Sequence, residues 1–196
     1  MQRRHFILTA GAALAVGSFG IAGCTTTPPG SASNTSGNAD KRRSINASVD
    51  GTLSRLYSSV SGSHELVDKA RGVLVFPSVI QAGFWVGGQY GDGALRVGGH
   101  TVGYYSTAAG SFGLQIGAQS KAIVFLFMTQ EALDRFRNSQ GWAVGGDATV
   151  ALVNVGANGN VDSSTATAPI EAFVMTNAGL MAGVSLEGTK VTRLDI

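Results

Sequence analysis

Few residues of this 196-residue chain could carry covalent or metal chemistry, since it contains one cysteine and three histidines. His64 stands near Glu65 and Asp68, a spacing that could gather metal ligands on one helix face but is more typical of surface ion pairs. His100 follows Gly98-Gly99 and is expected at an exposed hairpin tip. The sequence therefore predicts no catalytic residue and no metal site around these side chains.

Two further patterns could suggest enzyme chemistry. The segment Gly87-Gly88-Gln89-Tyr90-Gly91-Asp92-Gly93 lacks the Lys-Ser/Thr ending and the strand-to-helix setting of a phosphate loop, and turn chemistry explains it better. Asp147 and Glu187 stand beside glycines and are expected to be turn or cap residues rather than an acid-base pair. A Ser-His-Asp triad stays open, because its members need not be close in sequence. No nucleophile-elbow pattern supports one, so we expect a protein without enzymatic activity and without a cofactor.

The start of the chain has the order of features that marks an export signal. A short positive region is followed by an uncharged, largely apolar run from Phe6 to Gly23. Ile21-Ala22-Gly23-Cys24 resembles the lipobox of bacterial lipoproteins, with small residues just before the cysteine. The alternative is a transmembrane anchor, which needs about 20 strongly apolar residues, but four glycines dilute this run. We expect residues 1–23 to be a removed signal peptide and Cys24 to be the acylated, palmitate-labelled N-terminus.

The same segment indicates the export route and the destination. Arg3-Arg4-His5-Phe6-Ile7 resembles the twin-arginine export motif, but it lacks the usual Ser or Thr before the arginines and the Lys after the apolar pair. General secretion therefore remains the alternative route. Thr25 follows the cysteine, where an Asp usually retains Gram-negative lipoproteins in the inner membrane. We expect a protein anchored by lipid in the cell envelope, in the outer membrane and facing the periplasm.

Charge and cysteine content restrict the partners of the mature chain. The full chain has 14 basic and 12 acidic residues, and removal of Arg3 and Arg4 with the signal leaves 12 of each. Such a balance gives no electrostatic footprint for nucleic acid. Cys24 is the only cysteine, so the mature chain has no disulfide even in an oxidising compartment. Packing alone must hold the domain together.

The chain after the signal divides into a tether and one domain. Residues 24–43 are expected to form a flexible tether, because they are mostly Thr, Ser, Pro, Gly, Asn and Ala. The domain is expected over residues 44–196. It begins with a helix whose apolar stripe consists of Ile45, Val49, Leu53, Leu56, Tyr57 and Val60. A short second helix is expected after an N-cap at Ser63.

Beyond Gly72 the pattern becomes that of short strands. Val73-Leu74-Val75-Phe76-Pro77 predicts a buried strand, and residues 81–119 contain eleven glycines. Turns are expected at Gly91-Asp92-Gly93 and Gly98-Gly99, and Thr129 is expected to open a helix over residues 129–138. Later strands are expected at residues 123–128, 141–146, 148–155, 169–176, 180–186 and 190–195. The predicted fold class is α+β, mainly antiparallel β, with a glycine-rich barrel or sandwich-like sheet, N-terminal helices and one mid-chain helix.

Six blocks between residues 72 and 188 resemble the SYLF domain, which occurs in bacterial lipoproteins and in eukaryotic endocytic adaptors that carry Src-homology or FYVE modules. The blocks are Gly72-Val73-Leu74-Val75-Phe76-Pro77, Ala82 to Gly93, Gly113-Leu114-Gln115-Ile116-Gly117-Ala118-Gln119, Val124-Phe125-Leu126-Phe127, Val144-Gly145-Gly146-Asp147-Ala148 and Gly179 to Gly188. The resemblance implies a lipid-binding domain over about residues 45–196. In the eukaryotic members a basic amphipathic N-terminal segment is held responsible for phosphoinositide binding, and some members bind actin.

The composition of residues 41–71 agrees with this implication, because they hold six basic and three acidic side chains beside the apolar stripe. Basic amphipathic helices lie on anionic lipid. The candidate lipid-binding residues are Lys41, Arg42, Arg43, Arg55, Lys69, Arg71, Leu53 and Leu56. Phosphoinositide and actin are not expected in a bacterial envelope, so the expected partner is a membrane with anionic phospholipid such as phosphatidylglycerol or cardiolipin. The alternative is that the stripe packs on the sheet.

Two functions follow, and they belong to different classes. The first is a phospholipid-binding module held at the membrane by its lipid anchor and without catalytic activity. The alternative is a structural or protein-interaction module of the cell envelope that uses its sheet surface. The sequence identifies no particular protein partner.

Overall fold

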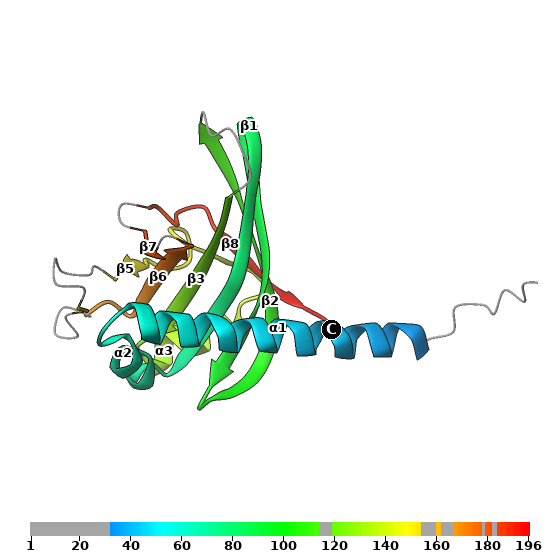
Figure 1. Ribbon diagram of the computed structural model, residues 1–196, viewed down its shortest axis with the longest axis horizontal. Coiled ribbons are helices and arrows are strands. Elements are labelled where there is room, and N and C mark those ends of the chain that lie inside the picture. Colours follow the sequence, from blue (N-terminus) through cyan, green and yellow to red (C-terminus); the bar gives the residue numbers. More distant parts are fainter. Residues whose placement is uncertain (1–31, 114–118, 154–159, 162–166, 178, 182–183) are drawn as a thin grey trace, which may run out of the picture.

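The computed structural model describes residues 32–113, 119–153, 160–161, 167–177, 179–181 and 184–196. The predicted signal peptide and Cys24 lie outside these residues. Three helices and a sheet make up the described part (Figure 1). The elements are α1 (Ala32–Ser59), α2 (Ser63–Lys69), β1 (Gly72–Val97), β2 (His100–Gly113), β3 (Gln119–Phe127), α3 (Gln130–Asn138), β4 (Trp142–Ala143), β5 (Ala151–Leu152), β6 (Ile170–Thr176), β7 (Gly179–Leu180) and β8 (Lys190–Leu194). No helix among the described residues is both long enough and apolar enough to span a bilayer.

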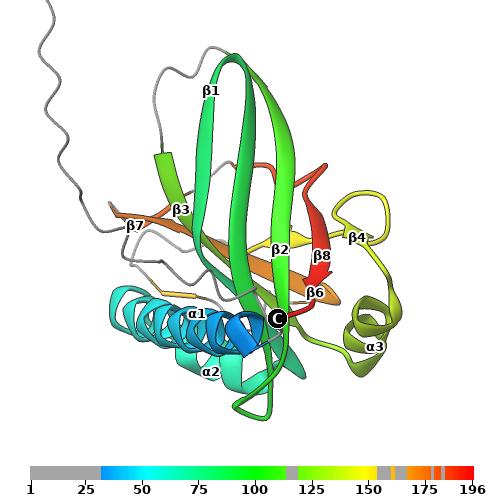
Figure 2. The same cartoon turned by 90° about the vertical axis from the view of Figure 1, so that its right-hand side faces the viewer.

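The strands form one strongly curled sheet, half of a barrel, in the order β4-β8-β2-β1-β3-β6-β5, with β7 paired to β6. Neighbouring strands are antiparallel except β5 and β6, which are parallel. Figure 2 shows α1 and α2 on one side of the sheet and α3 on the other. The predicted class, α+β with mainly antiparallel strands, is therefore confirmed.

Strand β1 doubles back on itself, so that its two parts lie side by side (Figure 2). Residues 72–81 pair with β3, whereas residues 85–97 pair with β2. A Cβ atom on Gly93 would lie 2.1 Å from the carbonyl oxygen of Val75, and one on Gly91 would lie 2.5 Å from that of Ser78. Only glycine allows this approach. The predicted turn at Gly91-Asp92-Gly93 is thus wrong, because these glycines lie within a strand and make room for another backbone.

The predicted turn at Gly98-Gly99 is correct. Both glycines have positive φ values, 57° and 81°, and they connect β1 to β2. Glycine takes these left-handed conformations at little steric cost. The hairpin pairs Val97 with His100 next to the turn, and the His100 side chain is exposed as expected.

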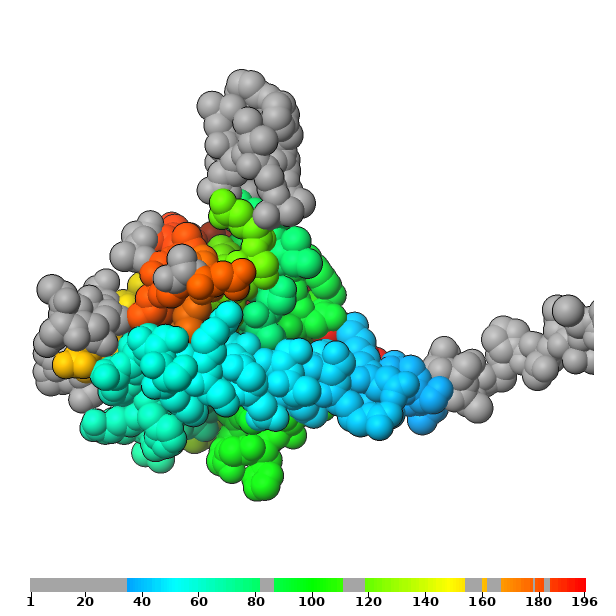
Figure 3. Space-filling model, in the orientation of Figure 1, coloured from blue at the N-terminus to red at the C-terminus, as the bar shows by residue number. Residues whose placement is uncertain are grey.

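Helix α1 begins earlier than predicted, at Ala32 instead of near Ser44. Residues 32–43 of the expected tether are therefore helical. The first turns of the helix whose burial is described, residues 35–40, are almost entirely exposed, and Figures 1 and 3 show this end of α1, in blue, extending past the sheet. The composition correctly indicated that this stretch buries little surface, but a helix can continue outward from a packed one without burial of its own.

The apolar stripe of α1 forms part of the hydrophobic core. Its members pack on the sheet with residues of β1, β3 and β6. The buried stripe residues are Ile45, Val49, Leu53, Leu56 and Val60, and their sheet neighbours include Val73, Val75, Val124 and Phe173. Leu56 and Val49 have no exposed surface. The stripe therefore faces protein.

Helix α3 has the predicted position and cap. The Thr129 hydroxyl accepts a hydrogen bond from the backbone N–H of Ala132 at 3.2 Å, which satisfies one of the free donors at a helix N-terminus. Leu133 and Phe136 are buried on the opposite face of the sheet from α1. The Phe136 ring lies 5.5 Å from the Trp142 ring, edge to face, and this cluster holds the second layer of the core.

Among the described residues of the strands expected at 141–146 and 148–155, only β4 and β5 are strands, two residues each; residues 154–155 lie outside the description. A tight turn interrupts them, because Asp147 accepts a hydrogen bond from the Ala143 N–H at 2.7 Å through its carboxylate and donates its own N–H to the Ala143 carbonyl at 2.8 Å. Gly145 has a φ of 89° in this turn. Asp147 is thus the turn residue that was predicted. Of the strand expected at 180–186, the described residues 181 and 184–186 are not in a strand and Leu180 belongs to β7, whereas residues 182–183 lie outside the description.

Glu171 in β6 is a carboxyl group buried to 3 % exposure. Burial raises its pKa, and a hydrogen bond from the Ala168 backbone opposes this to a smaller extent. Because folding raises this pKa, the folded state favours the protonated acid. The protonated carboxyl group therefore contributes to stability below its ordinary pKa of 4.5, and this contribution is lost as pH rises through the folded-state pKa.

We accordingly expect Glu171→Gln to raise the free energy of unfolding at pH 8 and to have a much smaller effect at pH 4. Urea unfolding at both pH values measures the difference. A variant that is less stable than the natural chain at pH 8 would show that the ionised carboxylate is useful to the fold.

Candidate functional site

The predicted basic segment does not form one surface. Lys41, Arg42 and Arg43 lie in the outer half of α1, whereas Lys69 and Arg71 lie at and just after the end of α2. About 25 Å of helix separates Arg42 from the end of α1, beside which α2 packs (Figure 1). The structure thus splits the candidate residues into two groups at opposite ends of α1.

The outer group, Lys41, Arg42 and Arg43, contains the more exposed basic side chains. Lys41 pairs with Asp92 of β1 at 3.0 Å, and Arg43 pairs with Asp40 one helical turn before it. Both side chains of the second pair are mostly exposed, Arg43 to 79 %. Arg42 is exposed, and none of the described residues forms an ion pair with it. Exposed pairs of this kind are weak, so Arg42 and Arg43 remain accessible to an external anion.

The inner group consists of Arg55, Lys69 and Arg71, whose charges do not form one patch. Lys69 pairs with Glu65 at 2.7 Å, which holds the pKa of that carboxyl below its usual value. Arg71 is exposed at the start of β1. Arg55 is only partly exposed, and its Nε atom is buried without a hydrogen-bond partner among the described residues. These three residues do not converge on one point.

Leu53 and Leu56 do not lie where the lipid-binding prediction requires them. Leu53 is 9 % exposed and Leu56 is fully buried, both in the core between α1 and the sheet. The packing alternative that the sequence left open is the one seen here. From Ser44 onward, the exposed residues of α1 are small and neutral apart from Asp50, namely Ser44, Ala47, Ser48, Gly51, Ser54, Ser58 and Ser59. They form neither an apolar nor a basic stripe.

Polar contacts fix the outer half of α1 against the sheet. Asn46 donates a hydrogen bond to the Tyr104 hydroxyl at 2.9 Å and accepts one from the Thr101 hydroxyl at 2.9 Å. The Tyr90 hydroxyl donates to Asp92 at 2.6 Å, and this bond, to the carboxylate that also pairs with Lys41, raises the pKa of Tyr90. These contacts hold the basic part of α1 against β1 and β2.

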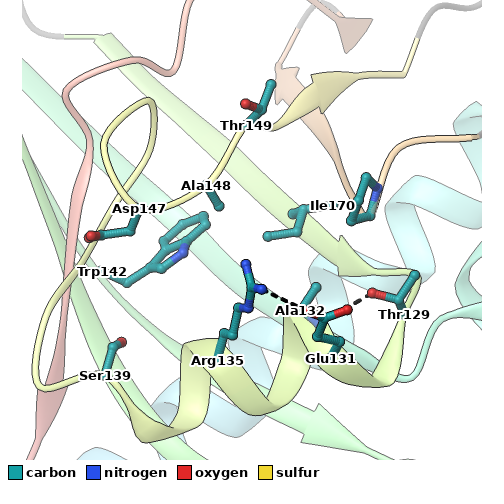
Figure 4. Close-up of a pocket in the computed structure, with 11 residues that line it drawn as sticks. Thr129, Glu131, Ala132, Arg135, Ser139, Trp142, Asp147, Ala148, Thr149 and Ile170 are labelled. Atoms are coloured by element: carbon teal, nitrogen blue, oxygen red, sulfur yellow. Dashed lines mark hydrogen bonds and ion pairs between the residues drawn. The ribbon is translucent and has the colours of Figure 1, made fainter.

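A groove of about 650 Å³ lies on the other side of the sheet, between α3, the turn after β4 and the start of β6. Figure 4 shows Trp142, Ala148 and Ile170 along its floor, with Glu131 and Arg135 on α3 at its rim. Arg135 pairs with Glu131 at 2.6 Å. The volume is within the range of small-molecule sites. Sequence reasoning missed this groove, because its lining comes from four separate segments.

A smaller cavity of about 420 Å³ lies between α1, α2 and the turn after β1. Arg96 and Asp50, which line it, form an ion pair at 2.5 Å. Burial raises the pKa of Tyr57 in its wall; the nearby Asp68 also raises it, whereas Arg96 lowers it. The charges of this cavity are thus paired within the protein.

The histidines behave as predicted for surface residues. His64 pairs with Asp68 at 2.8 Å, and its ring lies tilted against that of Tyr57 with 4.5 Å between the ring centres. The described residues contain no group of three or more His, Cys, Asp or Glu side chains arranged to hold a metal ion.

Comparison with known families gives a match that covers part of the sheet and helix α3. Residues 108–195 match the model of the Ysc84 family, which is described as "Las17-binding protein actin regulator". No curated protein matches the chain. The matched part runs from within β2 to the end of β8. It includes the core strands β3 and β6 and the groove beside α3, whereas α1, α2 and β1 lie outside it. This match confirms the sequence resemblance: residues 108–195 belong to the SYLF (Ysc84) family.

Proposed function

We propose that this protein is a lipoprotein of the cell envelope, anchored through Cys24 in the outer membrane and facing the periplasm. Its SYLF domain binds anionic phospholipid and catalyses no reaction. The observation that carries the proposal is the pair of exposed arginines, Arg42 and Arg43, at the end of α1 that adjoins the anchor segment.

The distance between the anchor and these arginines supports the proposal. Residues 25–31 separate Cys24 from the start of α1, and the eight Cα-to-Cα steps from Cys24 to Ala32 span at most about 28 Å. An acylated Cys24 therefore keeps Ala32 within about 28 Å of its lipid anchor, and the helix from Ala32 to Arg42 adds about 15 Å. Each basic side chain near an anionic surface contributes about 1 kcal/mol, so Arg42 and Arg43 together add a modest, salt-sensitive attraction.

Cys24→Ala is expected to abolish acylation and to leave an unprocessed precursor, because the lipid is attached to this sulfur before the signal is cut. Metabolic labelling with palmitate and the mass of the N-terminal peptide measure the effect. A mature, palmitate-labelled species in the variant would contradict the lipoprotein part of the proposal.

Arg42→Glu/Arg43→Glu is expected to weaken binding of the domain to anionic vesicles by about tenfold or more, since the two attractions become repulsions. Neither side chain is buried, so stability should change by less than about 0.5 kcal/mol. Co-sedimentation of a mature chain with Cys24→Ser measures the affinity without the acyl anchor.

Lys69→Glu/Arg71→Glu is the matched control, because it makes the same change of charge at the other end of α1. We expect it to retain most of the binding. Equal losses in the two variants would indicate that only net charge matters and that the outer end of α1 is no specific contact.

A protein-interaction module of the envelope is the second candidate function, and the groove beside α3 favours it. The floor of the groove includes Trp142 and Ile170, and aromatic side chains are enriched at protein interfaces. The description of the matched family also names a bound protein. The protein-interaction function becomes the better proposal if the non-acylated chain does not bind vesicles of any composition.

A further inference from the structure

The groove beside α3 has walls that the fold itself holds in place. Trp142 packs edge to face on two buried rings, with 5.5 Å between its ring centre and that of Phe136 and 5.6 Å to that of Phe125. The Thr129 cap holds the start of α3, and two hydrogen bonds of Asp147 hold the turn after β4. Sites for small molecules are usually formed in advance in this way.

The floor of the groove is apolar and lies below its rim. Trp142 is 3 % exposed and Ile170 is 2 % exposed, whereas the side chains of Arg135 and Glu131 on the rim are 75 % and 74 % exposed. A flat protein surface would therefore contact the rim only. The floor is accessible to a molecule small enough to enter, and about 650 Å³ leaves room for one with an apolar body.

Two hydrogen-bond donors face the space above this floor. Figure 4 shows the Arg135 guanidinium turned toward the centre of the groove and the Trp142 indole nitrogen on the side that faces Arg135. The indole N–H has no acceptor in the part of the chain that the structure describes, and it is not one of the buried unpartnered groups there, so it is open to solvent at the groove. The guanidinium donates to Glu131 at 2.6 Å, which leaves other N–H groups of its fork free.

The two carboxylates at the groove leave these donors available to a ligand. Glu131 forms an exposed ion pair with Arg135 one helical turn away, and such pairs are weak, so an entering anion can replace Glu131 on the guanidinium. The Asp147 carboxylate accepts the Ala143 N–H, and Figure 4 shows it pointing away from Arg135. A positive charge and a neutral donor therefore converge above an apolar floor.

We propose that this groove binds a small organic carboxylate. The carboxylate oxygens accept hydrogen bonds from the Arg135 guanidinium and the Trp142 indole N–H, and the apolar part lies on Trp142, Ala148 and Ile170. Bonds from arginine to a carboxylate are among the strongest in proteins. One guanidinium and one neutral donor suit the single charge of a carboxylate better than the double charge of a phosphate monoester.

This inference goes beyond the proposed function and does not depend on it, because α1 lies on the other side of the sheet (Figure 2). It assigns to a small ligand the groove that otherwise favours a protein partner. Its test therefore has a readout at the groove itself, separate from vesicle binding.

The test follows the indole N–H signals of the mature chain with Cys24→Ser by nuclear magnetic resonance. The chain contains two tryptophans, so the Trp142 signal is the one that disappears in Trp142→Phe. If that variant does not fold, it is the one that remains in Trp85→Phe. Phenylbutyrate is the probe, and we expect it to shift the Trp142 signal with half-saturation in about the millimolar range.

Two related compounds separate the parts of the ligand. Acetate has the carboxylate without the apolar body, and phenylbutylamine has the same body with a positive charge. We expect each to need at least about tenfold more compound for the same shift of the Trp142 signal, since each lacks one of the two contacts.

Arg135→Gln is expected to weaken phenylbutyrate binding by about tenfold or more, because it removes the charge-assisted hydrogen bond. The side chain is mostly exposed, so the fold should be retained. Arg137→Gln is the matched control, because it removes the same charge from an exposed position of the same helix that does not line the groove. It should bind phenylbutyrate as the natural chain does.

Three results would overturn the inference. A Trp142 signal that phenylbutyrate leaves unchanged would return the groove to a protein partner. Equal shifts with phenylbutyrate and phenylbutylamine would show apolar contact without recognition of the carboxylate. Equal losses in Arg135→Gln and Arg137→Gln would show attraction by net charge alone. None of these results alters vesicle binding, which tests the proposed function separately.

Discussion

Leu56→Asp is expected to lower the free energy of unfolding by about 4 kcal/mol or more, enough to unfold much of the protein. Leu56 has no exposed surface and packs between α1 and the sheet. The substitution removes its apolar contacts and leaves a carboxylate without a partner in the core. Urea unfolding followed by circular dichroism measures the change.

Ser54→Asp is the control, because Ser54 lies exposed on the same helix and a charge there changes stability by less than about 0.5 kcal/mol. If Leu56→Asp kept the natural stability and lost only vesicle binding, the stripe of α1 would face lipid after all. The packing of α1 on the sheet would then be wrong for the protein in solution.

Gly93→Ala is expected to lower the free energy of unfolding by about 3 kcal/mol, at the upper end of the cost of overpacking. The new methyl group would lie 2.1 Å from the Val75 carbonyl oxygen and 2.6 Å from the Phe76 ring. The first of these neighbours is backbone, which cannot turn away as a flexible side chain can, so the two parts of β1 must separate.

Gly88→Ala is its matched control in the same strand, because nothing lies within 4 Å of a Cβ there. Alanine is better than glycine in a strand interior by about 0.5–1 kcal/mol, so this variant should be neutral or slightly stabilised. Thermal unfolding of both variants measures the contrast. Equal stabilities would show that the two parts of β1 do not approach each other as described.

The local patterns of the sequence predicted the local elements well. Thr129 and the charges around Leu133 gave helix α3 with its cap, and the spacing from Ile45 to Val60 gave the packed part of α1. Both depend on contacts within one or two helical turns. The buried strand beginning at Val73 was also predicted, since an unbroken apolar run of that length has few other interpretations.

Long-range contacts explain where the prediction failed. Gly91 and Gly93 have the composition of a turn. Glycine is required there because the carbonyl groups of Ser78 and Val75, more than ten residues away in sequence, leave no room for a Cβ atom. The helical start at Ala32 was missed because residues 32–43 contain no large apolar residue, and helices are indicated in a sequence by the spacing of apolar residues. Two-residue strands such as β4 and β5 depend on their partners in the sheet more than on their own sequence.

The candidate site was predicted by composition and was only partly assembled by the fold. The basic residues near Lys41 do lie together on an exposed end, whereas those near Lys69 lie at the other end of α1. Charge counts along a segment carry no information on which end of a helix a residue occupies. The groove on Trp142 could not be predicted at all, because it forms where α3, the turn after β4 and the start of β6 meet.

Binding of the non-acylated mature chain to vesicles tests the proposed function most directly. A chain that starts at residue 24 with Cys24→Ser is mixed with neutral vesicles or with vesicles containing phosphatidylglycerol, and co-sedimentation is followed as salt is raised. We predict binding to the anionic vesicles that weakens with salt, because exposed charges are screened over about 8–10 Å at physiological ionic strength. Binding that is absent from both vesicles, or equal for both at every salt concentration, would contradict anionic phospholipid as the partner of this domain.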